Sequence, residues 1–198
     1  VMKEFYEVVK NDENKNIVQS LQFKLCNLKD INHTISRLAT SVVIDDIELY
    51  EVKSLALLSA DVKNILEKIS LDKIIKIPNL DEVVKILDPD GLRIATFYIY
   101  DSYSEELASL RKKLKEKDVY QEEIYNEVMR IEDEIRAELS SKLKPYSEAM
   151  TLALNALADV DINIAKSLQM KELGLCFPTI SSNNISSYKG IFHPEVKS

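Results

Sequence analysis

The most regular hydrophobic pattern in this sequence lies between Val119 and Leu173. In its first half, apolar residues recur every three or four positions, which is the period of one helical face rather than of a strand. The pattern predicts an amphipathic helix with its other face in solvent. Pro145, the one proline here, predicts a kink or hinge, because proline removes a backbone donor and clashes with the preceding turn. The apolar residues are Ile124, Val128, Ile131, Ile135, Leu139 and Leu143.

Beyond Pro145 the pattern widens, and apolar residues occupy nearly every face. This half is therefore expected to be enclosed by other parts of the chain. A single helix over 119–173 would be about 80 Å long, whereas a compact domain of this size is about 35 Å across. A rod longer than its domain favours a mechanical or bridging role. The apolar residues are Met150, Leu152, Leu154, Leu157, Val160, Ile162, Ile164 and Leu168.

Four shorter helices are predicted within the first ninety residues. Asp30 is the expected N-cap of the second of them. Asp45 and Glu48 have capping-box spacing at the start of the third, with Asp in place of Ser or Thr. Periodic apolar residues place the four helices at about 1–10, 30–39, 45–69 and 81–87.

Two other segments are less clear. Apolar residues alternate within Ile17–Asn27, so a short strand and a helix both remain open there. Ile94–Tyr100 is rich in β-branched and aromatic residues and is a candidate extended segment. The sequence Asp-Pro-Asp-Gly at 88–91 predicts a turn before it.

A reversal of the chain is predicted at 117–118. A leucine stripe marks a helix over 104–116, and Asp118 with Gln121 repeats the capping-box pattern. One helix therefore runs out and the helix over 119–173 returns. Gly174 is the expected C-cap of the returning helix.

These elements predict a mainly α fold. Residues 1–103 form a helical core, and residues 104–173 form a long antiparallel pair of lever helices (outgoing 104–116, returning 119–173, kink near 145). Residues 174–198 form a small C-terminal extended or β segment, in which 188–196 is a candidate edge strand.

Composition supports this fold class and narrows the function. Three Gly and five Pro in 198 residues disfavour a many-turned β fold. The net charge of −7 argues against a generally basic nucleic-acid binder. No apolar run approaches the roughly 18 residues of a membrane span, so we expect no membrane association. Cys26 and Cys176 lie far apart, which is typical of reduced thiols in a cytoplasmic chain.

No motif for catalysis or cofactor binding is found. The three glycines are isolated, so neither a Walker A loop nor a dinucleotide fingerprint is present. His33 and His193 lack the neighbouring ligands of a metal site. Cys26 and His33 have nothing to orient them as nucleophile and base. We therefore expect no catalytic residue, cofactor or metal in this chain and no enzyme activity of its own.

One basic cluster lies beside the predicted reversal. Cations at the tip of a rod are suited to contact DNA phosphates. A solvated helix end is the simpler interpretation, because cations are favoured near a helix C-terminus and acidic residues follow at once. The candidate DNA contacts are Arg111, Lys112, Lys113, Lys115 and Lys117.

Several segments resemble the MutS family of DNA mismatch repair proteins. ALADVDI at 156–162 resembles A-L-A-E-L-D-V-L on the family's returning lever helix, and GIFHPEV at 190–196 resembles G-R-H-P-V-V-E, which opens its ATPase domain. DDIELYEVK at 45–53 and PDGLRIATFYIYD at 89–101 look like the core region of MutS-related members. The resemblance covers most of the chain and rests on order and spacing.

The resemblance implies that this chain is the core and lever region (domain III) of a MutS-type protein, excised before the ATPase domain. The full-length parent would be a DNA-dependent ATPase that binds ATP and Mg²⁺, forms a homodimer and engages DNA in mismatch repair. The family inserts a clamp between its lever helices. Here only the residues around 115–118 separate them, which puts ordinary mismatch gripping in doubt.

Two functions of different classes follow. The first is a non-catalytic lever that couples an ATPase domain to DNA engagement. The second is a helical protein-interaction or dimerisation module, in which the stripe Ile124–Leu143 pairs with another helix in cis or in trans.

Overall fold

A computed structural model describes residues 1–115, 121–180, 182 and 185–191 of the chain. The regular secondary structure of these residues is helical and includes no strand, which confirms the predicted mainly α fold. The α-helices are α1 (Met2–Lys10), α2 (Lys15–Leu25), α3 (Asn32–Ala39), α4 (Asp46–Lys68), α5 (Asp81–Leu87), α6 (Glu105–Leu114), α7 (Gln121–Leu143) and α8 (Ser147–Leu173). The 3₁₀ turns within the described residues are η1 (Asp12–Asn14), η2 (Asp101–Tyr103) and η3 (Lys144–Tyr146).

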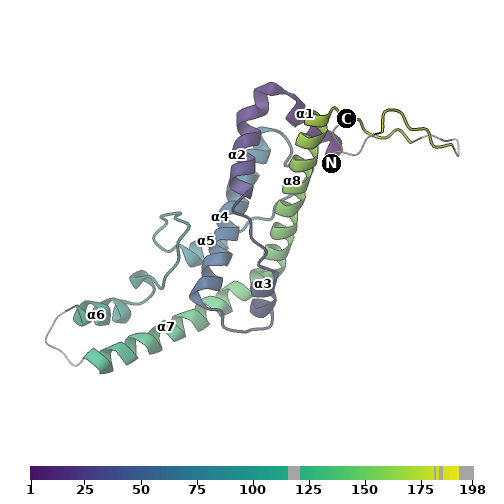
Figure 1. Cartoon of the computed structure of the whole chain (residues 1–198). Helices are drawn as coiled ribbons and strands as arrows, with labels where there is room; N and C mark the ends of the chain where they lie inside the picture. Colours follow the sequence, from purple (N-terminus) through teal and green to yellow (C-terminus); the bar gives the residue numbers. More distant parts are fainter. Residues whose placement is uncertain (116–120, 181, 183–184, 192–198) are drawn as a thin grey trace.

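The body of the molecule, α1–α5 with α8, is an elongated helical bundle (Figure 1). In it, α8 contacts α1, α2, α3 and α4, while α4 also packs on α2 and α5. Leu49 and Val62 of α4 and Leu157 and Val160 of α8 are completely buried. The core therefore combines the first hundred residues with the last helix, which is why α8 is apolar on most of its faces.

The open choice at Ile17–Asn27 is resolved as helix α2. Val18, Leu21 and Leu25 are buried, while Phe23 is 74 % exposed. The buried positions are three and four residues apart, so they share one helical face. The alternation that permitted a strand depended on Phe23, which points into solvent.

Of two N-caps predicted from the sequence, one is formed in the structure and the other is not. At α4 the capping box is formed, because Glu48 N donates to Asp45 Oδ1 at 2.9 Å and Asp45 N donates to Glu48 Oε2 at 3.0 Å. At α3 the expected N-cap was wrong. The helix begins at Asn32, and Asp30 Oδ1 instead accepts a hydrogen bond from Asn32 N at 3.0 Å. Asp30 thus shapes the turn before the helix rather than its first turn.

The arm, α6 with α7, projects from one end of the body as an antiparallel helical hairpin (Figure 1). Ser104 caps α6, and its side chain accepts a hydrogen bond from Leu107 N at 3.2 Å. The tip of the hairpin, including the predicted cap at Asp118, lies outside the described residues. Along α7 the predicted apolar stripe is buried, with Val128, Ile131 and Ile135 at most 6 % exposed. It packs against α6 and, nearer the body, against α5 and α3.

The single 80 Å rod is not formed. Instead α7 ends at Leu143, η3 occupies 144–146, and α8 turns into the body (Figure 1). Pro145 stands inside η3, where it lacks the N–H that a continuous helix would need. Ser147 Oγ donates to Lys144 O at 2.7 Å, which satisfies one backbone acceptor at the break. The chain therefore leaves the arm through a bend rather than a straight helix.

The candidate extended segments are irregular where they are described. Ile94–Tyr100 is a loop whose last two residues, Ile99 and Tyr100, are buried. Gly174 ends α8 in the left-handed conformation, as predicted, with φ 64°. Residues 188–191 of the predicted edge strand are not in a strand, and its remainder lies outside the described residues.

Candidate nucleic-acid interface and the base of the arm

Three of the predicted DNA-contacting residues lie near the tip of the arm. Lys112, Lys113 and Lys115 are exposed at the C-terminal end of α6, where the helix dipole favours cations. Lys117 lies outside the described residues. The structure therefore brings three lysines together at one helix end, within reach of a ligand in solvent.

Arg111 does not belong to this exposed group. It is directed toward the base of the arm and is 25 % exposed. Its guanidinium donates to Ile99 O at 2.8 Å, to Asp101 Oδ1 at 2.5 Å and to Glu132 Oε1 at 2.7 Å. Burial alone would lower the pKa of Arg111, but the hydrogen bonds to Glu132 and Asp101 outweigh burial and raise it. Arg111 is thus already occupied and is a structural residue rather than a free phosphate contact.

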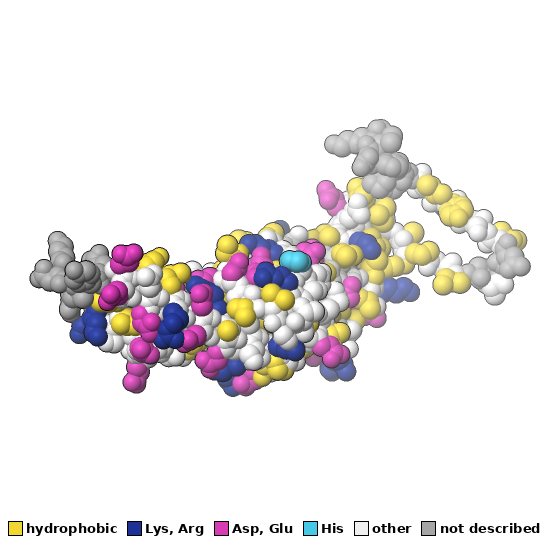
Figure 2. All heavy atoms as spheres, turned by 90° about the horizontal axis from the view of Figure 1, so that it is seen from below, with side chains coloured by type: hydrophobic (Ala, Val, Ile, Leu, Met, Phe, Trp, Pro, Cys, Tyr) yellow, Lys and Arg dark blue, Asp and Glu magenta, His cyan; other side chains and the backbone are white. Residues whose placement is uncertain are grey.

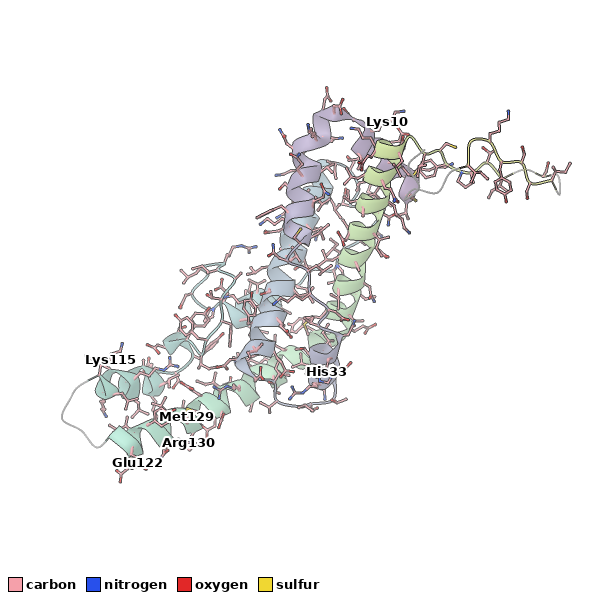
Figure 3. The ribbon with its side chains drawn as sticks, in the orientation of Figure 1. Lys10, His33, Lys115, Glu122, Met129 and Arg130 are labelled. Atoms are coloured by element: carbon pink, nitrogen blue, oxygen red, sulfur yellow. The ribbon has the colours of Figure 1, made fainter. Side chains whose placement is uncertain are left out.

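Acidic residues surround the tip lysines. Glu122 and Glu123 open α7, and Glu122 lies across the tip from Lys115 (Figure 3). Figure 2 shows basic and acidic side chains intermixed along the arm on the face in view. Mixed signs weaken the long-range attraction for a polyanion. DNA contact at this tip would therefore be weak and strongly dependent on salt.

A second charged cluster holds the arm to the body. Arg136 of α7 donates from Nε to Asp46 Oδ1 at 2.8 Å and from Nη2 to Asp46 Oδ2 at 3.3 Å. This paired, two-atom geometry fixes the angle between the groups as well as their distance. Arg136 Nη2 also lies 3.5 Å from Glu132 Oε2, and Glu132 binds Arg111. Hydrogen bonding to Asp46 is the main reason that the pKa of Arg136 is raised.

We call this cluster the arm joint. It links the first residue of α4 to α7, α7 to α6, and α6 to η2 through alternating charges. Arg136 and Glu132 are 16 % and 14 % exposed, so water screens them only in part. The arm therefore meets the body through several oriented charged hydrogen bonds. The joint residues are Asp46, Asp101, Arg111, Glu132 and Arg136.

A buried ion pair anchors the loop that precedes the arm. Lys53 of α4 is completely buried, and its Nζ donates to Asp88 Oδ1 and to Tyr100 OH, both at 2.9 Å. Tyr100 OH donates in turn to Thr96 O at 3.2 Å. Asp88 Oδ2 accepts a hydrogen bond from Arg93 N at 2.7 Å. One lysine thus ties both ends of the 88–100 loop to α4.

The carboxylate of Asp88 is ionised despite its burial. Burial raises its pKa, but the hydrogen bonds from Lys53 and from the Arg93 backbone, with their positive charges, more than offset this. The pKa of Asp88 therefore lies below its ordinary value. A charge pair so enclosed needs both partners, because either one alone would be a buried, uncompensated ion.

Sequence reasoning missed this pair and the arm joint. A signal for the pair was present, since Lys53 lies four residues after Leu49 and four before Leu57 and so shares their apolar helical face. A lone cation on such a face predicts a buried anion. No comparable signal marked the joint, because its members are ordinary surface residue types brought together only by the fold.

The structure adds little about other chemistry. Cys26, Cys176 and His33 are exposed. In the described ranges, no group of three His, Cys, Asp or Glu side chains is arranged to hold a metal ion. Of the helices that the structure describes, none combines the length and apolar character needed to cross a bilayer.

Comparison with protein-family models, with curated proteins and with solved structures found no match to this chain. The fold and the arm joint therefore stand on the geometry of this chain alone.

Proposed function

We propose that this chain is the core and lever region of a MutS-type, ATP-dependent DNA mismatch repair protein. It performs no catalysis itself and couples an ATPase domain of the parent to DNA engagement. ATP and Mg²⁺ belong to the parent, which would act in the cytoplasm as a homodimer. The proposal rests on the sequence resemblance, and one structural observation supports it: a helical arm joined to a packed helical body.

The connection between body and arm suits a lever. The chain passes from α7 in the arm through η3 directly into α8, which lies in the core. Because only the three residues of η3 separate α8 from α7, a displacement of α8 would reach the arm. The arm joint opposes rotation at η3, because Arg136 and Asp46 bind through two atoms each. Motion would therefore be passed to the tip instead of being lost at the bend.

DNA would meet the arm at its tip. Lys112, Lys113 and Lys115 are the described candidates, and Lys117 remains a candidate from the sequence. Each contact to a phosphate would release counterions, so binding would fall steeply with salt. The absence of a clamp insert in the sequence limits the arm to a small contact area. We therefore propose an auxiliary, sequence-independent contact rather than mismatch recognition by this chain.

The alternative, a helical interaction or dimerisation module, is less well supported. It requires the stripe Ile124–Leu143 to be available to another chain. Ile131 and Ile135 are only 5 % and 6 % exposed, because α6 and the body cover them. The apolar stripe of α7 is thus already paired with α6 of the same chain. A partner would have to use another part of the α7 surface, where Tyr125 and Met129 are exposed.

A titration of the chain with DNA tests the proposal. Mismatched, perfectly paired and branched duplexes would be compared at low and moderate salt by fluorescence anisotropy. The triple variant Lys112/Lys113/Lys115→Glu removes the tip cations. Its matched control, Lys10/Lys76/Lys166→Glu, makes the same change of charge at exposed positions of the body. Lys10 lies at the far end of the body from the arm (Figure 3).

We expect binding in the micromolar range at low salt that falls as salt rises. The Lys112/Lys113/Lys115→Glu variant should lose DNA binding, and the Lys10/Lys76/Lys166→Glu variant should keep most of it. Equal loss in both variants would show that net charge alone drives binding. No binding to any duplex at low salt would contradict a DNA contact in this chain.

A further inference from the structure

A cleft with a volume of about 380 Å³ lies beside α4. One wall is the C-terminal end of α2 with the connection that follows it, and the other is the loop at Arg93–Ala95. Volumes of 300–1,000 Å³ are typical of small-molecule sites. Its apolar lining includes Ile31, Leu55 and Leu58, which supply a surface for an apolar group.

Cations predominate among the side chains of the rim that lack a charged partner. Lys24 is neutralised by Asp61 at 2.6 Å. Lys29 lies over the Tyr50 ring, with Nζ 5.6 Å from its centroid. Among the described residues, Arg93 has no carboxylate within ion-pair distance, although it borders this cleft and two neighbouring hollows. The rim therefore offers positive charge on a chain whose net charge is −7.

The backbone of Arg93 is held in an unfavourable conformation. Its φ of 52° lies in the left-handed region, which residues with a Cβ seldom adopt. Arg93 N is fixed by Asp88 Oδ2, and Asp88 is fixed by buried Lys53. Backbone conformations of this kind persist where the surroundings impose them, and they are concentrated at ligand sites. The buried ion pair thus places an exposed arginine at the edge of the cleft.

A hydroxyl group in the wall also lacks a partner. Ser54 lines the cleft, and its Oγ is buried without a hydrogen bond to any described residue. Buried hydroxyls are normally hydrogen-bonded, so an unpaired one calls for an explanation. Ser54 therefore offers an unused hydrogen-bonding group in the wall of the cleft.

We propose that this cleft binds a small molecule with an apolar body and a single carboxylate. The apolar body would lie against Leu55 and Leu58. The carboxylate would pair with the planar guanidinium of Arg93, whose fork of N–H groups matches two carboxylate oxygens. Glu51, which also lines the cleft, disfavours a second negative charge on the ligand.

An NMR titration with 4-phenylbutyrate at constant pH and ionic strength tests this inference. The neutral amide of the same acid controls for the charge, and acetate controls for the apolar body. Arg93→Gln removes the proposed carboxylate partner. Arg130→Gln, an exposed arginine on the arm, is the matched control. Ala95→Glu adds a repulsive charge at an exposed position of the rim.

We expect saturable shifts at Lys29, Tyr50 and Ser54 with 4-phenylbutyrate. Affinity should fall about tenfold or more in Arg93→Gln, the usual effect of losing a charged hydrogen bond. Ala95→Glu should abolish binding, and Arg130→Gln should not change it. The inference is overturned if no saturable shifts occur, if the amide binds as well as the acid, or if Arg93→Gln binds normally.

Discussion

The body and the arm joint are both held by ion pairs, yet the two sets of pairs differ in burial. Lys53 and Asp88 in the body are 0 % and 1 % exposed. Arg136 in the joint is 16 % exposed and its partner Asp46 is 42 % exposed. The first pair is enclosed by protein on every side, while the second remains partly in contact with water.

This difference separates two roles for charge. A fully buried pair contributes little net stability when it is intact, but the loss of one partner is costly. A partly exposed pair is cheap to break, and its main effect is on geometry. The body pair therefore locks the 88–100 loop, whereas the joint sets the direction of the arm at little cost in stability.

The largest expected effect is the loss of one partner in the body. Lys53→Ala would leave Asp88 buried and uncompensated, and should lower the free energy of unfolding by about 3–5 kcal/mol. Urea unfolding followed by circular dichroism measures this. The double variant Lys53→Met/Asp88→Leu should recover much of the loss. If Lys53→Ala were as stable as Lys53→Met/Asp88→Leu, the Lys53–Asp88 pair would not be enclosed as described.

The second largest effect is expected when a buried apolar side chain is shortened to alanine, and it should differ between the body and the arm. Leu157→Ala in the body should lower the free energy of unfolding by about 3 kcal/mol, because the residue is fully buried. Ile131→Ala in the arm should mainly reduce hydrogen-exchange protection of α6 and α7, since a hairpin with few neighbours can open locally. If the helices of the body lost as much hydrogen-exchange protection as α6 and α7 in Ile131→Ala, this would show that arm and body unfold as one cooperative unit.

The pH dependence of stability should also depend on the body pair. The pKa of Asp88 is lower in the folded chain than in the unfolded chain. Its contribution is therefore complete above the unfolded value of about 4 and is lost as pH falls through the folded value. Below pH 4 the free energy of unfolding of the Lys53→Met/Asp88→Leu variant should fall less steeply with falling pH than that of the unchanged chain. The difference in slope should be at most about 1.4 kcal/mol per pH unit. Parallel acid-unfolding curves would contradict this.

Arg136→Gln should have a smaller effect on stability, about 1 kcal/mol, because Asp46 is partly solvated. Arg130→Gln, on the same helix, is the control. Within the part of the chain that the structure describes, Arg130 pairs only with Glu127 and Glu134 of its own helix. It is half exposed, so its loss should leave the unfolding midpoint unchanged. An Arg130 effect as large as that of Arg136 would remove the distinction between the joint and the rest of the arm surface.

Local patterns predicted most of the helices because apolar residues recur every three or four positions along them. The capping box at Asp45 and Glu48 and the C-cap at Gly174 depend on neighbours within one or two turns, so the sequence displays them directly. Pro145 predicted a kink in one continuous helix, whereas the structure ends α7 there and begins a separate helix, α8. The sequence leaves Ile17–Asn27 open between helix and strand because Phe23, an exposed aromatic residue, completes an alternation of apolar residues typical of a strand.

The joint and the buried pair could not be read in the same way. Arg136 and Asp46 are ninety residues apart in sequence, and nothing local to either identifies the other. The sequence groups Arg111 with the three neighbouring lysines at the tip, but its side chain donates a hydrogen bond to Glu132 of α7. Such contacts depend on how helices cross, which hydrophobic period alone does not determine.

The central claim is that the joint holds the arm at one angle to the body. Double electron–electron resonance measures this directly, with spin labels at Met129→Cys on the arm and Lys10→Cys on the body (Figure 3) and with Cys26 and Cys176 replaced by serine. We predict one narrow distance distribution that broadens in Arg111→Gln/Arg136→Gln. A broad distribution in the otherwise unchanged chain, or one that the double variant leaves unaltered, would contradict the claim.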